Sequence, residues 1–249
     1  MKIATTIKEV RKQVADWKRE GLTVGLVPTM GALHEGHASL VDAAKEQCDC
    51  VVTSVFVNPT QFAAGEDLDA YPRDFDRDCK ILEAHGCDLV FHPGVEEMYP
   101  EGAATFVELR SDMTKQLCGK SRPEHFCGVC TVVSKLFHIA MPDKAFFGEK
   151  DAQQLAVIRQ MTRDLLFGIE IVGCPTKREE DGLAKSSRNA YLNVEERKAA
   201  GILYQAICKA QEYLKEHLDT EDGKTESQPV TELIKGIIGT EPLAEIDYV

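Results

Sequence analysis

A segment of strand, turn and helix near the N-terminus constrains the fold more than any other part of the sequence. The apolar run at residues 22–27 is typical of a buried strand, and residues 38–47 have apolar side chains at helical spacing. Between them, Gly31 and Gly36 let the backbone bend tightly and approach a ligand. A second run, residues 51–57, is β-branched and almost wholly apolar, as in a strand covered on both faces. Strand, helix and strand in this order predict a parallel crossover, and therefore an α/β fold.

The turn in this segment carries His34 and His37, whose spacing of three places both imidazoles on one side of a helical turn. A neutral imidazole donates one hydrogen bond, and an imidazolium adds a positive charge. The pair can therefore stabilise phosphate oxygens, as can the free amides at the start of the helix. A structural pair or a metal-binding pair fits the same spacing. The turn is a candidate triphosphate site, with those two alternatives open.

The hydrophobic pattern continues this alternation of helices and strands along the chain. We expect a helix from Ile7 to Trp17 that stops near Gly21, and further strands at 88–91, 105–109, 144–147 and 169–172. We also expect helices at 75–85, at 128–139 and from about 154 to 165, and a short helix or turn at 95–100. A long helix at 194–217, an acidic linker at 219–228, a short helix through Leu233 and Ile238 and a strand at 244–249 follow. These elements predict a Rossmann-like parallel sheet over residues 1–175 and a smaller α/β domain over residues 176–249.

The composition excludes some classes of protein. A net charge of −12 and a pI near 5.1 argue against a nucleic-acid partner, since nucleic-acid binding needs a basic face. No apolar stretch approaches the length of about 20 residues that spans a membrane, and no signal peptide is apparent, so we expect a cytoplasmic protein with no membrane partner.

The nine cysteines are scattered along the chain, as expected for reduced, packed thiols in the cytoplasm. Cys127 and Cys130 have the CxxC spacing of redox and zinc sites. No second ligand pair stands nearby, because Cys48 and Cys50 have a different spacing. A structural role for the CxxC pair is favoured.

Polar side chains follow the strand at residues 51–57. Asn58 and Gln61 offer amides that can hold a carboxylate or a hydroxyl, although a plain turn explains the same composition. Residues 65–72 are polar and acidic, which indicates a mobile surface segment. We expect this segment to lie over the ligand crevice at the carboxyl ends of the strands, with Tyr71 and Arg73 at the rim of that crevice.

Two later segments also suit phosphate. Lys150 stands at a strand-to-helix turn, where it can contact phosphate, and Asp151 can reach a ribose hydroxyl or a metal; a solvated turn is the alternative. Ser186, Ser187 and Arg188 form a compact phosphate-binding set, and here the alternative is a capped helix start.

Five motifs in order resemble those of the pantothenate synthetase (pantoate–β-alanine ligase) family. His34-Glu35-Gly36-His37 resembles the His-x-Gly-His signature of the nucleotidyltransferase superfamily. Residues 58–61, 125–137, 148–154 and 181–189 resemble later motifs of the pantothenate synthetases, and the resemblance covers most of residues 22–195. It implies a nucleotidyltransferase-type domain over 1–175 and a lid domain over 176–249. Members of the family usually continue for a few tens of residues more, so we expect either a shortened lid domain or a truncated chain.

The resemblance also implies an activity: ATP-dependent joining of pantoate to β-alanine through a pantoyl adenylate, with Mg²⁺, in a homodimer. His37 is the first choice for proton handling, with His34 and Lys150 as the other catalytic residues. Gln61 and Gln154 are implied as pantoate ligands, with Asn58 and Tyr71 added to the pantoate and β-alanine site, and Asp151 is the candidate metal ligand. The implied ATP-binding residues are Met30, Gly31, Ala32, Leu33, His34, Glu35, Gly36, His37, Gly148, Glu149, Lys150, Asp151, Lys177, Lys185, Ser186, Ser187 and Arg188.

Two positions depart from the family pattern. Lys177 stands where valine is expected, and Lys185 stands where methionine or leucine is common. Their added positive charge is expected to change the affinity or selectivity of the adenine pocket for the nucleotide. Two other functions stay open: a nucleotidylyltransferase of the same superfamily, and a nucleotide-binding dimer without catalysis.

Overall fold

The computed structural model describes residues 1–63, 65–217 and 226–249. The chain divides into two compact units, residues 1–176 and 177–249. Each unit is described separately below.

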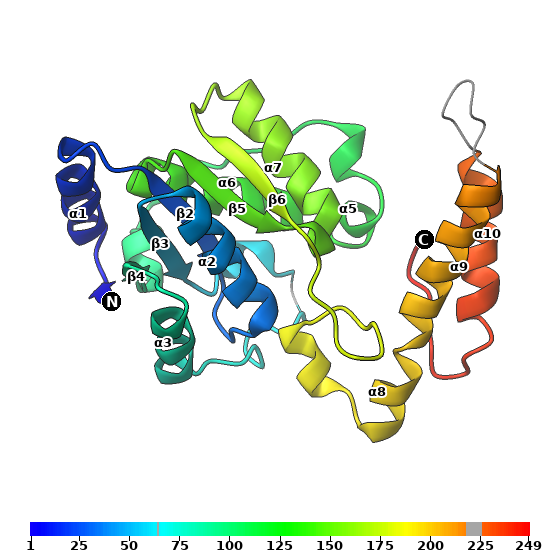
Figure 1. Ribbon diagram of the computed structural model, residues 1–249. Coiled ribbons are helices and arrows are strands. Elements are labelled where there is room, and N and C mark those ends of the chain that lie inside the picture. The colour runs from blue at the N-terminus through cyan, green and yellow to red at the C-terminus, as the bar shows by residue number, and fades with distance from the viewer. Residues whose placement is uncertain (64, 218–225) are drawn as a thin grey trace. The chain divides into compact units, whose positions relative to one another are not determined.

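The first unit is built on a six-stranded parallel sheet with the order β1-β4-β3-β2-β5-β6 (Figure 1). The strands are β1 (Lys2–Ala4), β2 (Val24–Thr29), β3 (Cys50–Val55), β4 (Leu89–Phe91), β5 (Lys144–Gly148) and β6 (Glu170–Cys174). The predicted α/β fold with a parallel sheet is confirmed. The sequence analysis missed β1, since three residues at a sheet edge are too few to show a periodic pattern.

Helices cover both faces of this sheet. The longer ones are α1 (Ile7–Arg19), α2 (Glu35–Gln47), α3 (Phe75–Ala84), α6 (His125–Ala140) and α7 (Ala152–Asp164). Shorter ones are α4 (Val95–Met98), α5 (Cys118–Ser121) and the 3₁₀ turns η1 (Pro59–Gln61), η2 (Asp112–Thr114) and η3 (Glu149–Asp151). None of the described helices has the length and hydrophobicity needed to cross a membrane.

Neighbouring residues of one strand enter separate apolar cores. Leu26 packs in a core with side chains of α1, α6 and α7, whereas Val27 packs in a core with side chains of α2 and α3. Phe147 and Phe146 are divided in the same way. Because side chains alternate along a strand, a sheet buried on both faces is apolar at successive positions. This explains the continuous apolar runs in the sequence.

Two predictions in the first unit are wrong. Residues 105–109 form no strand, although their composition favours one, and the amide of Val107 instead donates to Thr131 Oγ1 at 2.9 Å. The helix predicted at 128–139 starts earlier than expected, because α6 already begins at His125.

The regular elements described in the second unit are helical: η4 (Ser187–Tyr191), α8 (Val194–Ala199), α9 (Ile202–His217) and α10 (Ser227–Ile238), with α9 packed against α10. The predicted single helix at 194–217 is wrong because the chain is interrupted at Ala200 and Gly201. The predicted strand at 244–249 is also wrong, since no strand forms there. Of the predicted linker at 219–228, residues 219–225 lie outside the described part, and its last two residues belong to α10.

Candidate active site

The carboxyl ends of β2, β3 and β5 meet at the centre of one sheet edge. β2 pairs with β3 on one side and with β5 on the other, and all three strands are parallel (Figure 1). The chain moves outward from β2 to β3 and β4, and later returns to the opposite side of β2 as β5. Ligands of α/β sheets bind outside such a switch point. The three segments that begin there carry the histidine motif, Asn58 to Gln61, and Gly148 to Asp151.

A buried carboxylate fixes the turn after β2. Asp78 of α3, 1% exposed, accepts hydrogen bonds from the amides of Ala32 at 3.0 Å and Leu33 at 2.7 Å. These bonds hold Ala32 at a φ of 51°, in the left-handed region. At Gly31, with a φ of 83°, a Cβ atom would lie 2.9 Å from Asp78 Oδ2. The sequence analysis missed Asp78, whose only local signal is a carboxylate four residues before the core residue Leu82.

The backbone amides of this turn have partners inside the protein. Gly31 N–H donates to Thr29 Oγ1, His34 N–H to His37 Nδ1, and Gly36 N–H to His34 Nδ1. The amides of His37 and Ala38 both donate to the carbonyl of His34. The expectation that free amides at this helix start receive phosphate is therefore wrong for these residues. At these residues, the side chains are the donors that remain for a ligand.

The two imidazoles of the motif share one tautomer. His34 Nδ1 accepts from Gly36 N–H at 3.1 Å, His37 Nδ1 accepts from His34 N–H at 3.3 Å, and the ring centroids are 4.1 Å apart. A neutral imidazole with an accepting Nδ1 carries its proton on Nε2. Each ring therefore has an Nε2–H donor on the side away from the turn.

His37 is neutral at physiological pH. Its burial, followed by the nearby charges of His34 and Lys150, lowers its pKa from the usual 6.5 to about 3. Of the two chemical forms considered for this residue, the neutral donor applies and the imidazolium does not. The effect of Lys150 on this pKa also shows that the β5 segment brings its charge close to the histidine motif.

The β3 segment presents Gln61 beside this motif. Gln61 Nε2 lies 3.1 Å from Met30 Sδ, and Gln61 Oε1 accepts from Asn58 Nδ2 at 3.0 Å. Asn58 is 1% exposed and also donates to the carbonyl of Gly128 at 3.3 Å. Asn58 therefore holds the loop and the Gln61 side chain in place. Its own side-chain amide is already hydrogen-bonded within the protein.

Residues that the sequence analysis did not single out hold the carbonyl of Gln61. Arg122 Nη2 donates to this oxygen at 3.1 Å, and His125 Nδ1 lies 2.9 Å from it. Arg122 also makes two hydrogen bonds to the carboxylate of Glu66, each of 2.5 Å. Glu66 belongs to the segment that was expected to be mobile, so this ion pair connects that segment to the end of α5.

Tyr71 of the same segment is 4% exposed and packs edge-on against Phe62. Arg73 donates to the carbonyl oxygens of Leu68 and Tyr71. The Tyr71 side chain is thus buried, whereas the sequence analysis placed it at the rim of the crevice.

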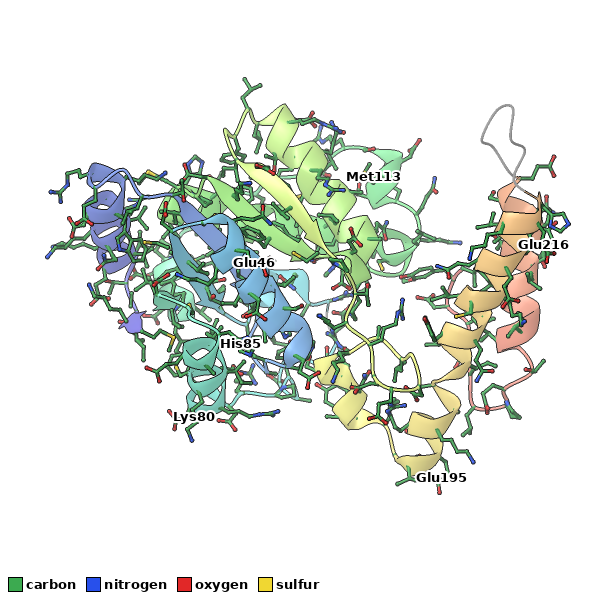
Figure 2. All side chains as sticks on the ribbon, viewed as in Figure 1. Glu46, Lys80, His85, Met113, Glu195 and Glu216 are labelled. Carbon is green, nitrogen blue, oxygen red and sulfur yellow. The ribbon has the colours of Figure 1, made fainter. Side chains whose placement is uncertain are left out.

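Two adjacent glutamines after β5 have different environments. Gln153 donates to the carbonyls of Gln116 and of Met113, which is labelled near α5 and α7 in Figure 2, and it accepts from the amide of Cys118. Gln154 makes no such bond with any residue that the structure describes, and it is half-buried. The amide of Gln154 is therefore available to a ligand, while that of Gln153 holds the chain around η2 and α5.

In the turn that precedes these glutamines, Lys150 and Asp151 form an ion pair. Lys150 Nζ lies 3.2 Å from Asp151 Oδ1, and both side chains are more than one-third exposed. Water screens such a pair, so it holds the two groups together only weakly. Both groups can therefore turn toward a bound nucleotide at little cost.

The CxxC pair lies on α6, and all nine cysteines are free thiols. Cys130 is fully buried, and burial raises its pKa to about 12. Within the described ranges, no group of three His, Cys, Asp or Glu side chains has the arrangement of a metal site. Cys130 packs as part of the core, and Cys127 is half-buried.

In the second unit, residues 177–185 form a tight hairpin. The amide of Lys185 donates to the carbonyl of Lys177 at 2.9 Å, and the side chain of Lys185 pairs with Glu179 at 3.1 Å. Gly182 has a φ of 88° and lies against the ring of Tyr204, where no Cβ would fit.

Ser186 follows the hairpin directly. Its hydroxyl accepts from the amide of Arg188 at 3.2 Å and caps η4, which includes Ser187. The alternative of a capped helix start is therefore realised at Ser186. Lys177 and the loop from Lys185 to Arg188 belong to the second unit, and the contacts given for them are contacts within that unit.

Comparison with protein families gives one match that spans almost the whole chain. The model of a family described as pantoate-beta-alanine ligase matches residues 2–249. A pantothenate synthetase of Carboxydothermus hydrogenoformans is 55% identical over 249 residues, which are 100% of this chain and 86% of that protein. One of Enterococcus faecalis has the same identity and coverage.

Solved structures agree with this match. The pantothenate synthetase of Thermus thermophilus superposes with a TM-score of 0.89 and 48% identity, over 97% of this chain and 83% of that chain. The pantoate-beta-alanine ligase of Francisella tularensis, described as complexed with beta-gamma ATP and beta-alanine, has a TM-score of 0.81 and 36% identity, over 95% and 86% of the two chains.

Proposed function

Because the chain belongs to the pantoate-beta-alanine ligase family, we propose that it joins pantoate to β-alanine at the expense of ATP, through a pantoyl adenylate. The products are pantothenate, AMP and pyrophosphate. The observation that carries this proposal is the arrangement of three adjacent parallel strands whose carboxyl ends bear His37, Gln61 and Lys150.

The first step activates a poor acyl donor. A carboxylate oxygen of pantoate attacks the α-phosphorus of ATP, a new P–O bond forms, and the bond from the α-phosphorus to the bridging oxygen breaks as pyrophosphate leaves with its electron pair. Such phosphoryl chemistry depends mainly on positioning and charge stabilisation. The protein needs no nucleophile of its own.

The residues of the first unit divide these tasks by their chemistry. The Nε2–H groups of His34 and His37 are hydrogen-bond donors suited to phosphate oxygens, and the ammonium of Lys150 supplies positive charge for the leaving pyrophosphate. Gln61 and Gln154 suit the oxygens of pantoate. The internal pairing of the amides in the β2 turn supports this reliance on side chains.

In the second step, the amine of β-alanine attacks the carbonyl carbon of the adenylate. The C–N bond forms, AMP departs with the electrons of the C–O bond, and the amine gives up a proton. A half-buried, neutral His37 with a pKa of about 3 is a weak base. We therefore assign it hydrogen-bond donation, in place of the proton handling expected from the sequence.

The site suits a Mg²⁺ ion whose main ligands are the phosphates of ATP. Magnesium in nucleotide sites usually keeps several waters and takes only one or two carboxylates besides the phosphates. Asp151, beside Lys150, suits the role of a single protein ligand, and that role needs no cluster of acidic residues. When bound, the ion would neutralise charge on the phosphates.

For the second unit, we propose a lid that contributes Ser187, Arg188, Lys185 and Lys177 to nucleotide binding. Support comes from the family resemblance of residues 181–189 and from the hairpin that presents them. The pairing of Lys185 with Glu179 offsets part of its added charge, so the effect on the adenine pocket is expected to be small.

We also propose a homodimer. Residues 105–109 have the composition of a strand but belong to no ladder within the described chain, and Phe106 is 56% exposed. A chain segment of this kind favours pairing with another chain. The cytoplasm is the proposed location, supported by nine free thiols.

The test is to mix the protein with ATP, Mg²⁺, pantoate and β-alanine and to detect pantothenate and AMP by mass spectrometry. With β-alanine omitted, pyrophosphate should exchange into ATP only when pantoate is present. Exchange without pantoate would favour a nucleotidylyltransferase. ATP binding with no exchange would favour a protein without catalysis, and either result would contradict the proposal.

A further inference from the structure

Tyr99 stands outside the residues assigned above to ATP or pantoate, yet its hydroxyl reaches the loop that carries Gln61. It donates to Asn58 Oδ1 at 2.8 Å and lies 3.2 Å from Thr60 Oγ1. Lys135 Nζ is 4.0 Å from the centroid of the Tyr99 ring and so holds the ring from α6. Burial raises the pKa of Tyr99, which keeps the hydroxyl protonated and able to donate.

Two backbone groups determine how the Asn58 amide is oriented. The N–H of Thr60 can only donate, and it lies 3.4 Å from Oδ1. The carbonyl of Gly128 can only accept, and it lies 3.3 Å from Nδ2. Oδ1 must therefore be the acceptor and Nδ2 the donor. The hydroxyls of Tyr99 and Thr60 add two further donors to the same Oδ1.

The orientation of the Asn58 amide determines that of the Gln61 amide. Because Asn58 Nδ2 donates at 3.0 Å, its partner on Gln61 must be Oε1. The NH₂ group of Gln61 then points to the other side, toward Met30 of the histidine motif, whose sulfur is only a weak acceptor. Its donors are therefore available to a stronger acceptor.

We propose that Tyr99 is a positioning residue that acts through Asn58 to hold Gln61 with its NH₂ group toward the acid substrate. This inference rests on the proposed function, in which Gln61 binds pantoate. An NH₂ donor suits a carboxylate or hydroxyl oxygen, whereas a reversed amide would present Oε1 and repel a carboxylate. The Tyr99 hydroxyl thus stabilises the Asn58 amide in the orientation that the two backbone groups determine, and this orientation lets Gln61 recognise an acid.

The first measurement is the steady-state kinetics of Tyr99→Phe, which removes only the hydroxyl. KM for pantoate should rise about three- to tenfold, as expected for loss of one hydrogen bond. KM for ATP should stay unchanged, and kcat should change less than about twofold. Thr60→Val, which removes the second hydroxyl donor to Asn58, should act in the same direction. Tyr213→Phe on α9, a tyrosine that stacks on His217, is the matched control and should leave all three constants unchanged.

A double-mutant cycle with Gln61→Ala separates positioning from general damage to the fold. If Tyr99 acts through Gln61, Tyr99→Phe should raise KM for pantoate no further once Gln61 is alanine. The proposal would be overturned if the fold increases in KM for pantoate of Tyr99→Phe and Gln61→Ala multiply in the double variant. It would also be overturned if KM is unchanged in Tyr99→Phe and Thr60→Val but raised in Gln61→Ala. An unchanged KM in Gln61→Ala itself would instead reject the pantoate assignment on which the inference rests.

Discussion

The charge state of His37 decides how the histidine motif acts. Its pKa of about 3 makes it a neutral donor through Nε2, so in the proposed site the positive charge at the pyrophosphate comes from other groups, such as Lys150 and Arg188. The sequence indicated both imidazoles but left their protonation open. Burial and neighbouring charges, which no local pattern reveals, determine it.

His37→Ala should lower kcat by about a hundredfold or more, since loss of one transition-state donor costs about 2.7–4 kcal/mol. His37→Gln retains a neutral N–H donor and should recover part of this loss. Steady-state turnover near neutral pH tests both variants, with urea unfolding as the control for folding. Near-normal turnover of the alanine variant would contradict the role.

The same pKa predicts how stability changes with pH. Between pH 6.5 and about 3, His37 is protonated in the unfolded chain before it is protonated in the folded protein, so acidification through this range favours unfolding. Above pH 6.5 the residue is neutral in both states. In urea titrations at about pH 8 and about pH 5, His37→Gln should lose less free energy of unfolding than the unmodified protein does. An identical loss would argue against the low pKa.

Gln153 and Gln154 form a matched pair for substitution. Gln154→Ala should raise KM for pantoate about tenfold or more and change the free energy of unfolding by less than about 0.5 kcal/mol. Gln153→Ala removes three internal hydrogen bonds and should cost about 1–3 kcal/mol of stability. Urea unfolding and pantoate kinetics on both variants test this prediction. If Gln153→Ala raises KM and Gln154→Ala lowers stability, the ligand-binding and structural roles belong to the opposite residues.

At the scale of elements, Gly128 brings α6 against η1. A Cβ atom at this position would lie 2.2 Å from the carbonyl oxygen of Thr60. Gly128→Ala should therefore destabilise the protein by about 1–3 kcal/mol and raise KM for pantoate as the Gln61 loop moves. Gly236→Ala in α10, where a Cβ meets nothing within 4 Å, should instead stabilise it by about 0.5–1 kcal/mol. Thermal unfolding of the two variants would show the contrast, and equal shifts would argue against the close approach.

Elements with strong local patterns were predictable, and those that depend on partners were not. α6 was recognised despite its β-branched residues because its apolar run is too long for a strand. Residues 105–109 have the composition of a strand, but a strand also needs a neighbour, which composition does not supply. The break at Gly201 divided a helix whose apolar spacing looked continuous.

The same distinction applies to the site. Its ligand-facing residues lie in recognisable motifs, whereas Asp78, Tyr99 and Arg122 support them from distant parts of the chain. Their contacts join residues 41 to 61 positions apart. No short sequence window contains both partners of such a contact.

At the scale of the whole molecule, both large apolar cores are formed by residues of the first unit. A fragment of residues 1–176 should therefore fold without the rest of the chain. Circular dichroism should show helix and strand content with a cooperative thermal transition. A disordered fragment would mean that the second unit is needed for folding.

The occupied backbone of the β2 turn has a consequence for how this protein can change. Every residue except proline has a backbone N–H, so a site built from amides resists most point mutations. In the site proposed above, the corresponding donors are side chains, among them two imidazoles and an ammonium. Nucleotide affinity can accordingly drift or be engineered one codon at a time, while the buried carboxylate of Asp78 preserves the shape of the turn.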